Sequence, residues 1–596
     1  MAKKYSPLHF KAMKKTIRLR TPFEVGDIPL SEYPRPQFQR DSYLTLNGKW
    51  QYAIYRNSEM FDGYQGEILV PFSPESLLSG LKEGTLVTPN DVLYYHRTFT
   101  VPEKFIKAKT FINFGAVDYA CKVTINGKVI GEHFGGYTPF SFDISEVLMT
   151  GENTIDVVVT DPSDTSYHSR GKQALKNGQI WYTPQSGIWQ SVWLESVPET
   201  YLKDLTIIPD IDNDCVFLRL DKPQGALAEI IVADNGVTLS KVACDRDMAV
   251  ISMKDYELWC PENPKLYDII IKVGDDIVKS YFGMRKFSIV TDSLGFKRLG
   301  LNNKPYFHKG VLDQGYWSDG MLTPPSNAAL EYDVKLVKSM GFNMIRKHIK
   351  IEPLRWYYHC DKEGILVWQD MVSGGEKYNF LYIGFLAFLE KHIKDDSPSQ
   401  YKKLARGNED GRIEFENEVH QTMDYLKNVV SLSVWVPFNE GWGQFDSVRI
   451  TKEMKKIDPT RIIDSVSGWN DQGKDSSDLK SRHIYFKPIT VPRKDKRCYV
   501  LSEFGGYSLP VKEHMFSNKT FGYRIYKTTD DLAEAFTKLY EKSILPLVDK
   551  GLSATVYTQV SDVEEEINGL VTYDRKVVKF PLKLMKSLNE RLKIND

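Results

Sequence analysis

Hydrophobic and polar residues alternate over short segments in the first third of the chain. In CKVTINGKVIGEHF the alternation flanks an Asn-Gly pair at 126–127, which suits the positive φ angles of a tight hairpin turn. In GENTIDVVVTDP, Ile155, Val157 and Val159 share one face before Asp-Pro ends the run. Many such strands without a long helical pattern predict a β-sandwich of jelly-roll type over residues 1–198.

A second group of short strands predicts another sandwich over residues 199–288. The segments are YLKDLTIIPDI, CVFLRL, AEIIVAD, LYDIIIKV and KSYFGMRKFSIV. About 90 residues of short strands suit an immunoglobulin-like β-sandwich. The cysteine–tryptophan–cysteine spacing of antibody domains is missing, so only the general architecture is predicted.

From residue 289 to 596, short apolar strands alternate with helical patterns. The strand candidates are PYFHKGVL, FNMIRKH, ILVWQDM, SLSVWVPFN, RIIDSV, HIYF, CYVLSEF and SATVYTQV. One helical stretch is DDLAEAFTKLYEKSI, with Leu532 and Phe536 on its apolar stripe and Thr529 as its expected N-cap. Eight strands with helices between them predict a (β/α)8 TIM barrel.

Two glutamates stand at the ends of barrel strands, where the active sites of such barrels lie. Glu440 follows SLSVWVPFN, and Glu503 lies in CYVLSEFGGYS. Glycoside hydrolysis uses two carboxyl groups, one as a proton donor and one ionised. The spacing that separates retention from inversion is not contained in a sequence, and surface or ion-paired glutamates are the plain alternative.

Other polar and aromatic residues end the same strands and predict a sugar pocket, because each desolvated hydroxyl needs a partner. The predicted substrate-binding residues are Asn439, Arg346, His348, Asp313, Asp370, Trp469, His483, Tyr485, Tyr557 and Gln559. Five aromatic residues lie near these strand ends: Trp317, Trp368, Trp442, Trp469 and Tyr557. One or two of the five are expected to line the pocket.

At these residues the chain resembles glycoside hydrolase family 2. FNEGWG is similar to the family's acid/base motif, which places Glu440 as general acid/base and Asn439 at the sugar 2-hydroxyl. SEFGG is similar to the nucleophile motif, with Glu503 as nucleophile, and GFNMIRKH resembles its Asn-x-x-Arg signature at Asn343 and Arg346. The resemblance implies three domains and a retaining double displacement on terminal β-linked sugars.

Two departures from the family pattern bear on the sugar. The family's histidine falls three residues after the arginine, whereas His348 falls two after Arg346. The glucuronidases' Asn-x-Lys pair is matched by the stretch 568–570, Asn-Gly-Leu, without a lysine. A β-galactosidase-like specificity is therefore expected, with β-glucuronidase or another hexuronidase as the alternative. Some relatives bind magnesium, but its ligand set is not found in this sequence, so no cofactor is predicted.

Composition and charge limit which classes of binding partner and which cellular location are expected. Lys plus Arg and Asp plus Glu both number 78, a balance that disfavours nucleic acid. Six cysteines without a C-x-x-C pair indicate free thiols. The basic N-terminus has no apolar segment after it, and no apolar run has the length of a membrane span. A cytoplasmic protein that acts on a small carbohydrate is expected; a homo-oligomer is possible.

Two alternatives to an enzyme stay open. A carbohydrate-binding protein without catalysis is disfavoured because both glutamates are present, and a scaffold would not need the polar ring. A G-x-S-x-G elbow and a P-loop are absent from the sequence. The long connection 376–412 exceeds ordinary barrel loops, and either a lid or aglycone subsite or a structural or oligomer contact would explain it.

Overall fold

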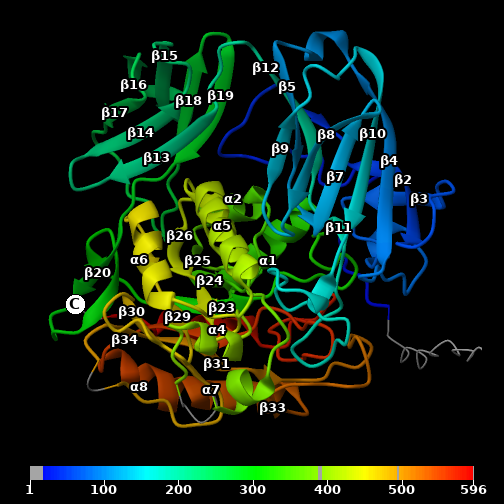
Figure 1. The fold of residues 1–596 in the computed structure, drawn as a ribbon. Coiled ribbons are helices and arrows are strands. Elements are labelled where there is room, and N and C mark those ends of the chain that lie inside the picture. Colours follow the sequence, from blue (N-terminus) through cyan, green and yellow to red (C-terminus); the bar gives the residue numbers. More distant parts are fainter. Residues whose placement is uncertain (1–17, 387–391, 493–494, 595–596) are drawn as a thin grey trace, which may run out of the picture.

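Two β-sandwiches stand side by side on a barrel (Figure 1). The computed structural model describes residues 18–386, 392–492 and 495–594. The first sandwich, the second sandwich and the barrel follow one another along the chain, so the predicted multidomain order with a TIM barrel is confirmed. The domain boundaries at 198 and 288 stay predictions.

The first sandwich consists of a four-stranded and a six-stranded antiparallel sheet. The smaller sheet contains, in spatial order, β1 (Leu44–Thr45), β12 (Val192–Val197), β5 (Lys109–Phe114) and β9 (Phe140–Asp143). The larger contains β3 (Gly66–Val70), β2 (Gly48–Arg56), β4 (Asp91–Val101), β10 (Gly151–Thr160), β7 (Ala120–Ile125) and β8 (Lys128–Phe134). A further short pair joins β6 (Val117–Asp118) to β11 (Gly187–Ile188).

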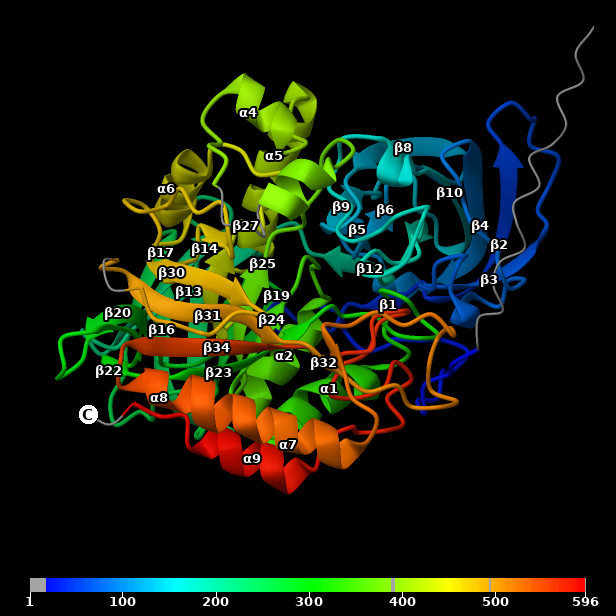
Figure 2. The same cartoon turned by 90° about the horizontal axis from the view of Figure 1, so that it is seen from below.

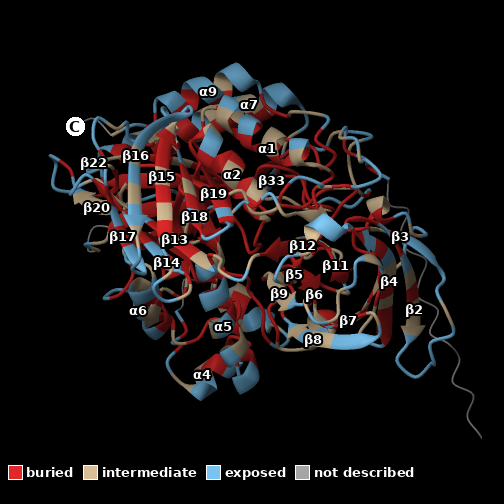
Figure 3. Ribbon diagram, turned by 90° about the horizontal axis from the view of Figure 1, so that it is seen from above, coloured by how far each residue is buried: buried red, intermediate tan, exposed pale blue. Residues whose placement is uncertain are grey.

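The sequence signals of this sandwich correspond to real elements. β7 and β8 form the predicted hairpin, with Asn126 at φ 50° and Gly127 at φ 76°. Ile155, Val157 and Val159 on β10 are buried in the core between the sheets. The alternation therefore predicted the buried face of β10 correctly. The edge strand β8 is mostly exposed to solvent (Figure 3).

The second sandwich pairs a three-stranded with a four-stranded sheet. The first contains β13 (Asp204–Asp210), β14 (Cys215–Asp221) and β17 (Met248–Ser252). The second contains β16 (Val237–Cys244), β15 (Ala228–Asp234), β18 (Tyr267–Val273) and β19 (Asp276–Phe282). The predicted strand KSYFGMRKFSIV is two strands: its second half is β20 (Phe287–Thr291), which joins β21 (Lys297–Leu301) and β22 (Lys304–Pro305) in a separate sheet.

The barrel contains eight parallel strands, one for each predicted segment. In chain order they are β23 (His308–Asp313), β24 (Met344–Lys347), β25 (Leu366–Asp370), β26 (Leu432–Val436), β28 (Ile462–Ile463), β30 (Leu479–Ile484), β31 (Cys498–Gly505) and β34 (Leu552–Thr558). The predicted sixth strand HIYF begins too late, because β30 ends at Ile484. Short pairs lie beside the barrel: β27 (Phe438–Asn439) with β29 (Val466–Ser467), and β32 (Tyr507–Ser508) with β33 (Arg524–Ile525).

Helices cover the outside of the barrel, and α7, α8 and α9 lie beside β34 (Figure 2). The α-helices are α1 (Asn327–Ser339), α2 (Leu354–Glu363), α4 (Pro398–Lys403), α5 (Glu409–Leu426), α6 (Ser447–Ile457), α7 (Thr529–Leu539), α8 (Leu545–Val548) and α9 (Leu582–Glu590). The predicted cap of α7 is one residue off: Thr528, not Thr529, accepts the amide hydrogen of Asp531, and Leu532 and Phe536 are buried as expected.

Alternate residues of each barrel strand face two different cores. Met344 and Trp368 belong to the cluster inside the barrel, which also contains Leu299 of β21. Ile345 and Val367, one position out of phase, belong to the cluster between the strands and the helices. This alternation decides below which strand-end residues reach the site. All six cysteines are free thiols, and none of the helices in the described ranges is both long and apolar enough to cross a bilayer.

Candidate active site

Glu440 is held in an unusual backbone conformation just beyond a barrel strand. β26 ends at Val436, and the two-residue strand β27 leads directly to Glu440. The glutamate has φ 53°, and its amide donates to the carbonyl of Ser467 at 3.0 Å. A left-handed conformation costs a non-glycine residue about 1–3 kcal/mol. The pairing of β27 with β29 holds this conformation and aims the side chain across the strand ends.

Glu503 lies opposite, within β31, and its carboxylate approaches that of Glu440. One oxygen of Glu440, one oxygen of Glu503 and one ring nitrogen of His483 all lie within 4.8 Å of one another. Retaining glycosidases have carboxyl groups about 5–5.5 Å apart, whereas inverting enzymes leave about 6.5–9.5 Å for a water molecule. The observed spacing fits the retaining geometry.

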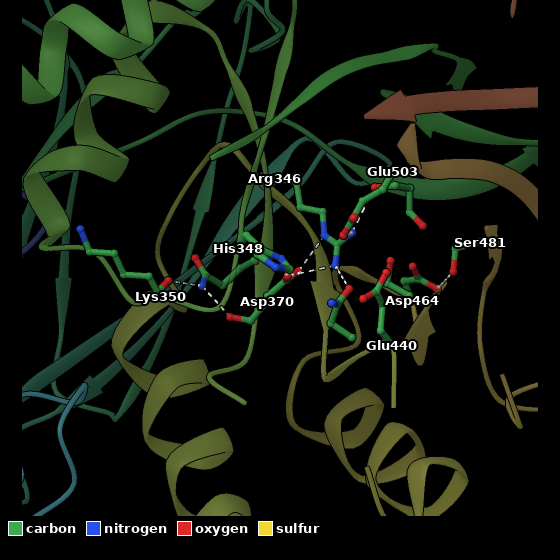
Figure 4. A network of polar contacts seen from close by, with 12 residues as sticks. Arg346, His348, Lys350, Asp370, Glu440, Asp464, Ser481 and Glu503 are labelled. Carbon is green, nitrogen blue, oxygen red and sulfur yellow. Dashed lines mark hydrogen bonds and ion pairs between the residues drawn. The ribbon is translucent and has the colours of Figure 1, made fainter. Parts of the chain in front are cut away.

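Arg346 connects the polar residues at the floor of the site (Figure 4). Its fully buried guanidinium makes a bidentate pair with Asp370, at 2.9 and 3.0 Å. It also donates to Glu503 Oε1 at 3.2 Å and to Asn439 Oδ1 at 2.8 Å. A planar donor fork with no protonation change at neutral pH suits this bridging position. The predicted group of Arg346, Asp370, Asn439 and Glu503 is thus brought together.

The surroundings of Glu503 favour its ionised form. Burial alone would raise its pKa, but the charges of His483 and Arg346 and a hydrogen bond from Tyr485 outweigh burial, so the pKa of Glu503 lies below its ordinary value. Tyr485 donates its hydroxyl hydrogen to Glu503 Oε2 and stacks on Tyr523, with ring centroids 3.8 Å apart. An ionised carboxylate is what a nucleophile requires.

His348 presents a neutral imidazole beside the floor. Burial, with a smaller contribution from the charge of Lys172, lowers its pKa well below the ordinary value. Its Nδ1 lies 2.7 Å from Asp370 Oδ2, so the neutral ring donates there and leaves Nε2 as an acceptor. His348 therefore lies beside Arg346 and Asp370, although it is one residue earlier than in the family pattern.

His483 contacts the two glutamates, a position that strand-end reasoning did not predict. Its Nδ1 lies 2.6 Å from Glu440 Oε1, and its Nε2 lies 2.9 Å from Ser467 Oγ and 3.5 Å from Glu503 Oε1. Trp469 covers the imidazole edge-on, with ring centroids 5.5 Å apart. The sequence interpretation had assigned His483 to sugar hydroxyls; the structure places it where it orients Glu440.

Three predicted residues are not brought to the site. Asp313 pairs with Lys347 and accepts the Gly315 amide at 2.8 Å. Tyr557 accepts the Tyr507 amide within the core between strands and helices. Gln559 donates to Asn568 Oδ1 at 2.8 Å. By the alternation of their strands, Asp313, Tyr557 and Gln559 are out of phase with the interior row.

A cavity of about 690 Å³ opens over Glu440 and His483, and much of its lining was not predicted. The loop of the first sandwich supplies Asp164, Arg170, Gln173, Ala174, Lys176, Gln179, Ile180 and Trp181. Trp442 and Trp469 are the two expected tryptophans that line it; Trp368 lies inside the barrel and Trp317 in the outer core. Alternation along strands contains no signal for a loop that reaches over from another domain.

The connection 376–412 contributes one wall. Lys377, Tyr378, Phe380, Ile383, Gly384 and His392 line the cavity. Its π-helical segment Leu381–Phe385 is described, whereas residues 387–391 lie outside the described part. Tyr378 stacks on Trp181 of the first sandwich, with ring centroids 5.6 Å apart. Its place in the cavity wall favours a lid or aglycone subsite over a purely structural or oligomer contact.

Glu440, His483 and Glu503 are also the one group of possible metal ligands with suitable spacing among the described residues. The group is the carboxylate pair itself with the histidine between. The expectation that no metal is needed stays a prediction.

Comparison with known proteins identifies the family. The models named "Glycosyl hydrolases family 2, sugar binding domain" and "Glycosyl hydrolases family 2, TIM barrel domain" match residues 79–198 and 294–496, together more than half of the chain. The chain belongs to glycoside hydrolase family 2. The matched ranges contain Glu440, Arg346 and all the residues of the first-sandwich loop that line the cavity.

Relatives within family 2 carry different names. A β-galactosidase of Halalkalibacterium halodurans is 25% identical over 525 residues, which cover 77% of this chain and 48% of that protein. The chain spans about half the length of the curated relatives it matches. Among solved structures, a Ruminococcus gnavus β-glucuronidase aligns with a TM-score of 0.73 at 16% identity, covering 94% of this chain and 99% of that one. An Eisenbergiella tayi β-galacturonidase bound to galacturonate aligns at 0.66 and 16%, covering 96% and 99%. These alignments show the shared fold.

Proposed function

We propose that the protein is a retaining exo-β-glycosidase that removes terminal β-linked sugars by double displacement. The observation that supports this most is the carboxylate spacing: oxygens of Glu440 and Glu503 lie within 4.8 Å. Oxygens this close favour the retaining spacing of about 5–5.5 Å over the about 6.5–9.5 Å that inversion needs for its water.

The environments of the two glutamates support different roles. Glu503, ionised beside Arg346 and Tyr485, attacks the anomeric carbon, and the bond to the leaving oxygen breaks as Glu440 gives that oxygen its proton. In the second step Glu440 takes a proton from water, the water oxygen attacks the anomeric carbon, and Glu503 leaves. His483 orients the Glu440 carboxyl group in both steps.

We propose Asn439, His348, Asp370 and Trp469 as groups that hold the sugar. They surround the two glutamates and offer an amide, an imidazole acceptor, a carboxylate and an aromatic face. The name of the Halalkalibacterium relative supports a β-galactosidase-like preference. A hexuronidase is the second candidate, because most charged residues that line the cavity are lysine or arginine. The six free thiols favour a reducing compartment such as the cytoplasm.

A hydrolysis screen tests the proposal. Wild type and Glu503→Gln are assayed against 4-nitrophenyl β-galactoside, β-glucuronide, β-galacturonide, β-mannoside, β-glucoside, β-fucoside and α-arabinopyranoside. We expect wild type to cleave at least one, with retention seen by NMR of the first product, and Glu503→Gln to cleave none. Inversion of the anomeric centre would reject the mechanism.

Glu440→Ala separates the second role from the first. An activated aryl leaving group needs little protonation, so glycosylation of Glu503 should persist while natural disaccharides are hardly cleaved. Azide should then restore turnover and yield a β-glycosyl azide. Equal loss on both substrate types, without azide rescue, would assign Glu440 another role.

A further inference from the structure

Lys172 is a buried lysine whose ammonium faces two aromatic rings but makes no hydrogen bond or ion pair in the described chain. The residue lies in the first-sandwich loop that lines the cavity, directly before Gln173, and is 7% exposed. Its Nζ lies 5.6 Å from the ring centroid of Trp442 and 5.7 Å from that of Tyr182. Among the described residues, none forms a hydrogen bond or an ion pair with this Nζ.

The other buried lysines of the described chain all have Nζ partners. Lys222 donates to the carbonyl of Asp245, Lys347 pairs with Asp313 and Glu352, and Lys579 pairs with Asp562. Lys350 donates to two carbonyls and pairs with Glu352. A buried charge without a partner is unfavourable, so such groups are nearly always paired. Lys172 is the exception among the buried lysines of the described chain.

The ammonium is next to the catalytic centre. Trp442, which it faces, comes two residues after Glu440 and lines the cavity. The charge of Lys172 contributes to the low pKa of His348 and opposes the rise that burial causes in the pKa of Asp370. Both effects place the charge beside the floor of the site rather than in a separate part of the sandwich.

A second cation of the same loop has a similar position. Arg170 is 4% exposed, donates to the carbonyl of Gly375, and lies 5.1 Å from the ring centroid of Tyr378, without a carboxylate partner among the described residues. Farther out, Lys176, Lys377, Lys480, Arg482 and Lys487 also line the cavity, against Asp164 and Glu440 as its acidic residues. The whole chain is balanced at 78 cations and 78 anions, so this excess is local.

We infer that Lys172 is a substrate-binding residue supplied by the first sandwich, and that its partner is a carboxylate on the sugar to be cleaved. The inference rests on the proposed glycosidase function and, of its two candidate specificities, favours the hexuronidase over the β-galactosidase-like one, so the substrate class is an acidic glycoside. A hydroxyl group can be bound by neutral side chains, whereas a desolvated ammonium is best balanced by an anion. The nearby Glu566 does not meet this need, because it accepts from Tyr182 and Asn568, and Tyr182 lies between it and Lys172.

The rival explanation is that Lys172 only balances the charges of Glu503 and Asp370. The two explanations differ in discrimination between substrates. We compare kcat/KM for 4-nitrophenyl β-galacturonide with β-galactoside, and for β-glucuronide with β-glucoside, in wild type, Lys172→Met and Lys172→Gln. Lys222→Met is the matched control, since Lys222 is a buried lysine of the second sandwich with its own partner.

We expect wild type to prefer the acidic member of at least one pair, and either Lys172 substitution to reduce that preference about 100-fold, as expected for a desolvated charge-assisted bond. The control should keep the preference. Thermal denaturation should show both variants folded, because they remove an unpaired charge. A wild type that prefers the neutral sugars would overturn the inference, and so would an equal loss on acidic and neutral substrates.

Binding separates this inference from the proposed function. Glu503→Gln, with and without Lys172→Met, is titrated calorimetrically with galacturonate, glucuronate, galactose and glucose. If no glycoside is cleaved but a uronate binds and Lys172→Met abolishes its binding, the glycosidase proposal fails and the carboxylate site stands. If the neutral sugars bind as well as the uronates, the carboxylate site is rejected whatever the enzyme cleaves.

Discussion

Replacement of Arg346 by methionine should weaken the barrel and move the acidic limb of the pH profile. The guanidinium is fully buried and bridges Asp370, Glu503 and Asn439. Methionine fills similar space but leaves two buried carboxylates without their cation. Breaking a buried ion pair by removal of one partner costs about 3–5 kcal/mol. Urea unfolding followed by tryptophan fluorescence should show a stability loss of this size for Arg346→Met.

The same contacts of Arg346 set the size of the shift in the pH profile. A unit charge about 4 Å away contributes about 4 kcal/mol at an effective dielectric near 20, and one pKa unit corresponds to about 1.36 kcal/mol. Asp370 shares the guanidinium charge, and His483 and Tyr485 still stabilise the Glu503 carboxylate after the substitution. We therefore expect the pKa of Glu503 to rise by at least about one unit.

The sign follows from the direction of the shift in wild type. The folded pKa of Glu503 is depressed, so its contribution to stability is present above the unfolded pKa and is lost as the pH falls through the folded pKa. Without Arg346 the nucleophile protonates at higher pH, and the acidic limb of kcat/KM moves upward. The profile is measured with an activated aryl glycoside, for which proton donation matters little.

Arg298→Met is the matched control. Arg298 is equally buried, donates to Asp292 at 2.6 Å and to the carbonyls of Leu552 and Val548, and lies away from the cavity. It should cost comparable stability and leave the acidic limb in place. If Arg346→Met were as stable as wild type with an unchanged limb, the bridging role derived from the distances would be refuted.

Three other substitutions probe the site and its surroundings. His483→Phe should lower turnover of natural disaccharides about 10- to 100-fold more than turnover of activated aryl glycosides, because Glu440 loses its orienting partner; equal losses would contradict this. Burial raises the pKa of Asp464 to about 6. The wild-type protein should therefore lose up to about 3 kcal/mol of unfolding free energy as the pH rises from about 4 to 7. In urea unfolding, Asp464→Asn should show a smaller dependence of stability on pH. Trp181→Ala should raise KM for disaccharides several-fold at nearly constant kcat, because the ring stacks on Tyr378 in the cavity wall; a kcat defect alone would place Trp181 elsewhere.

Periodicity predicted the strands well because it reports burial. The alternation in GENTIDVVVTDP gave the buried face of β10, and all eight barrel segments correspond to strands. It predicted the strand ends less well, since a side chain there faces either the barrel axis or the helices, and a shift of one residue changes its side. Asp370 and Arg346 are in phase with the interior, whereas Asp313 and Tyr557 are not.

Contacts between distant segments are not encoded in local patterns. His483 lies near the end of a barrel strand as predicted, but its contact with Glu440 depends on the left-handed turn at that glutamate and on the pairing of β27 with β29. The loop with Arg170 and Lys172 belongs to a different domain by sequence pattern. Its basic residues were visible in the sequence, but nothing local indicated that they reach the barrel mouth.

Backbone hydrogen bonds join this loop to the barrel. Arg170 and Gly171 both donate their amides to the carbonyl of Ser373, and Gly375 donates to that of His168. Gly374 permits this approach, since a Cβ there would lie 2.2 Å from the His168 carbonyl oxygen. Ser373 to Gly375 follow β25, the strand that ends in Asp370, so the same segment of barrel fixes both the floor of the site and the sandwich loop over it. Lys172 can therefore act as a rigid part of the pocket, because the loop that presents it is hydrogen-bonded to the segment that follows β25.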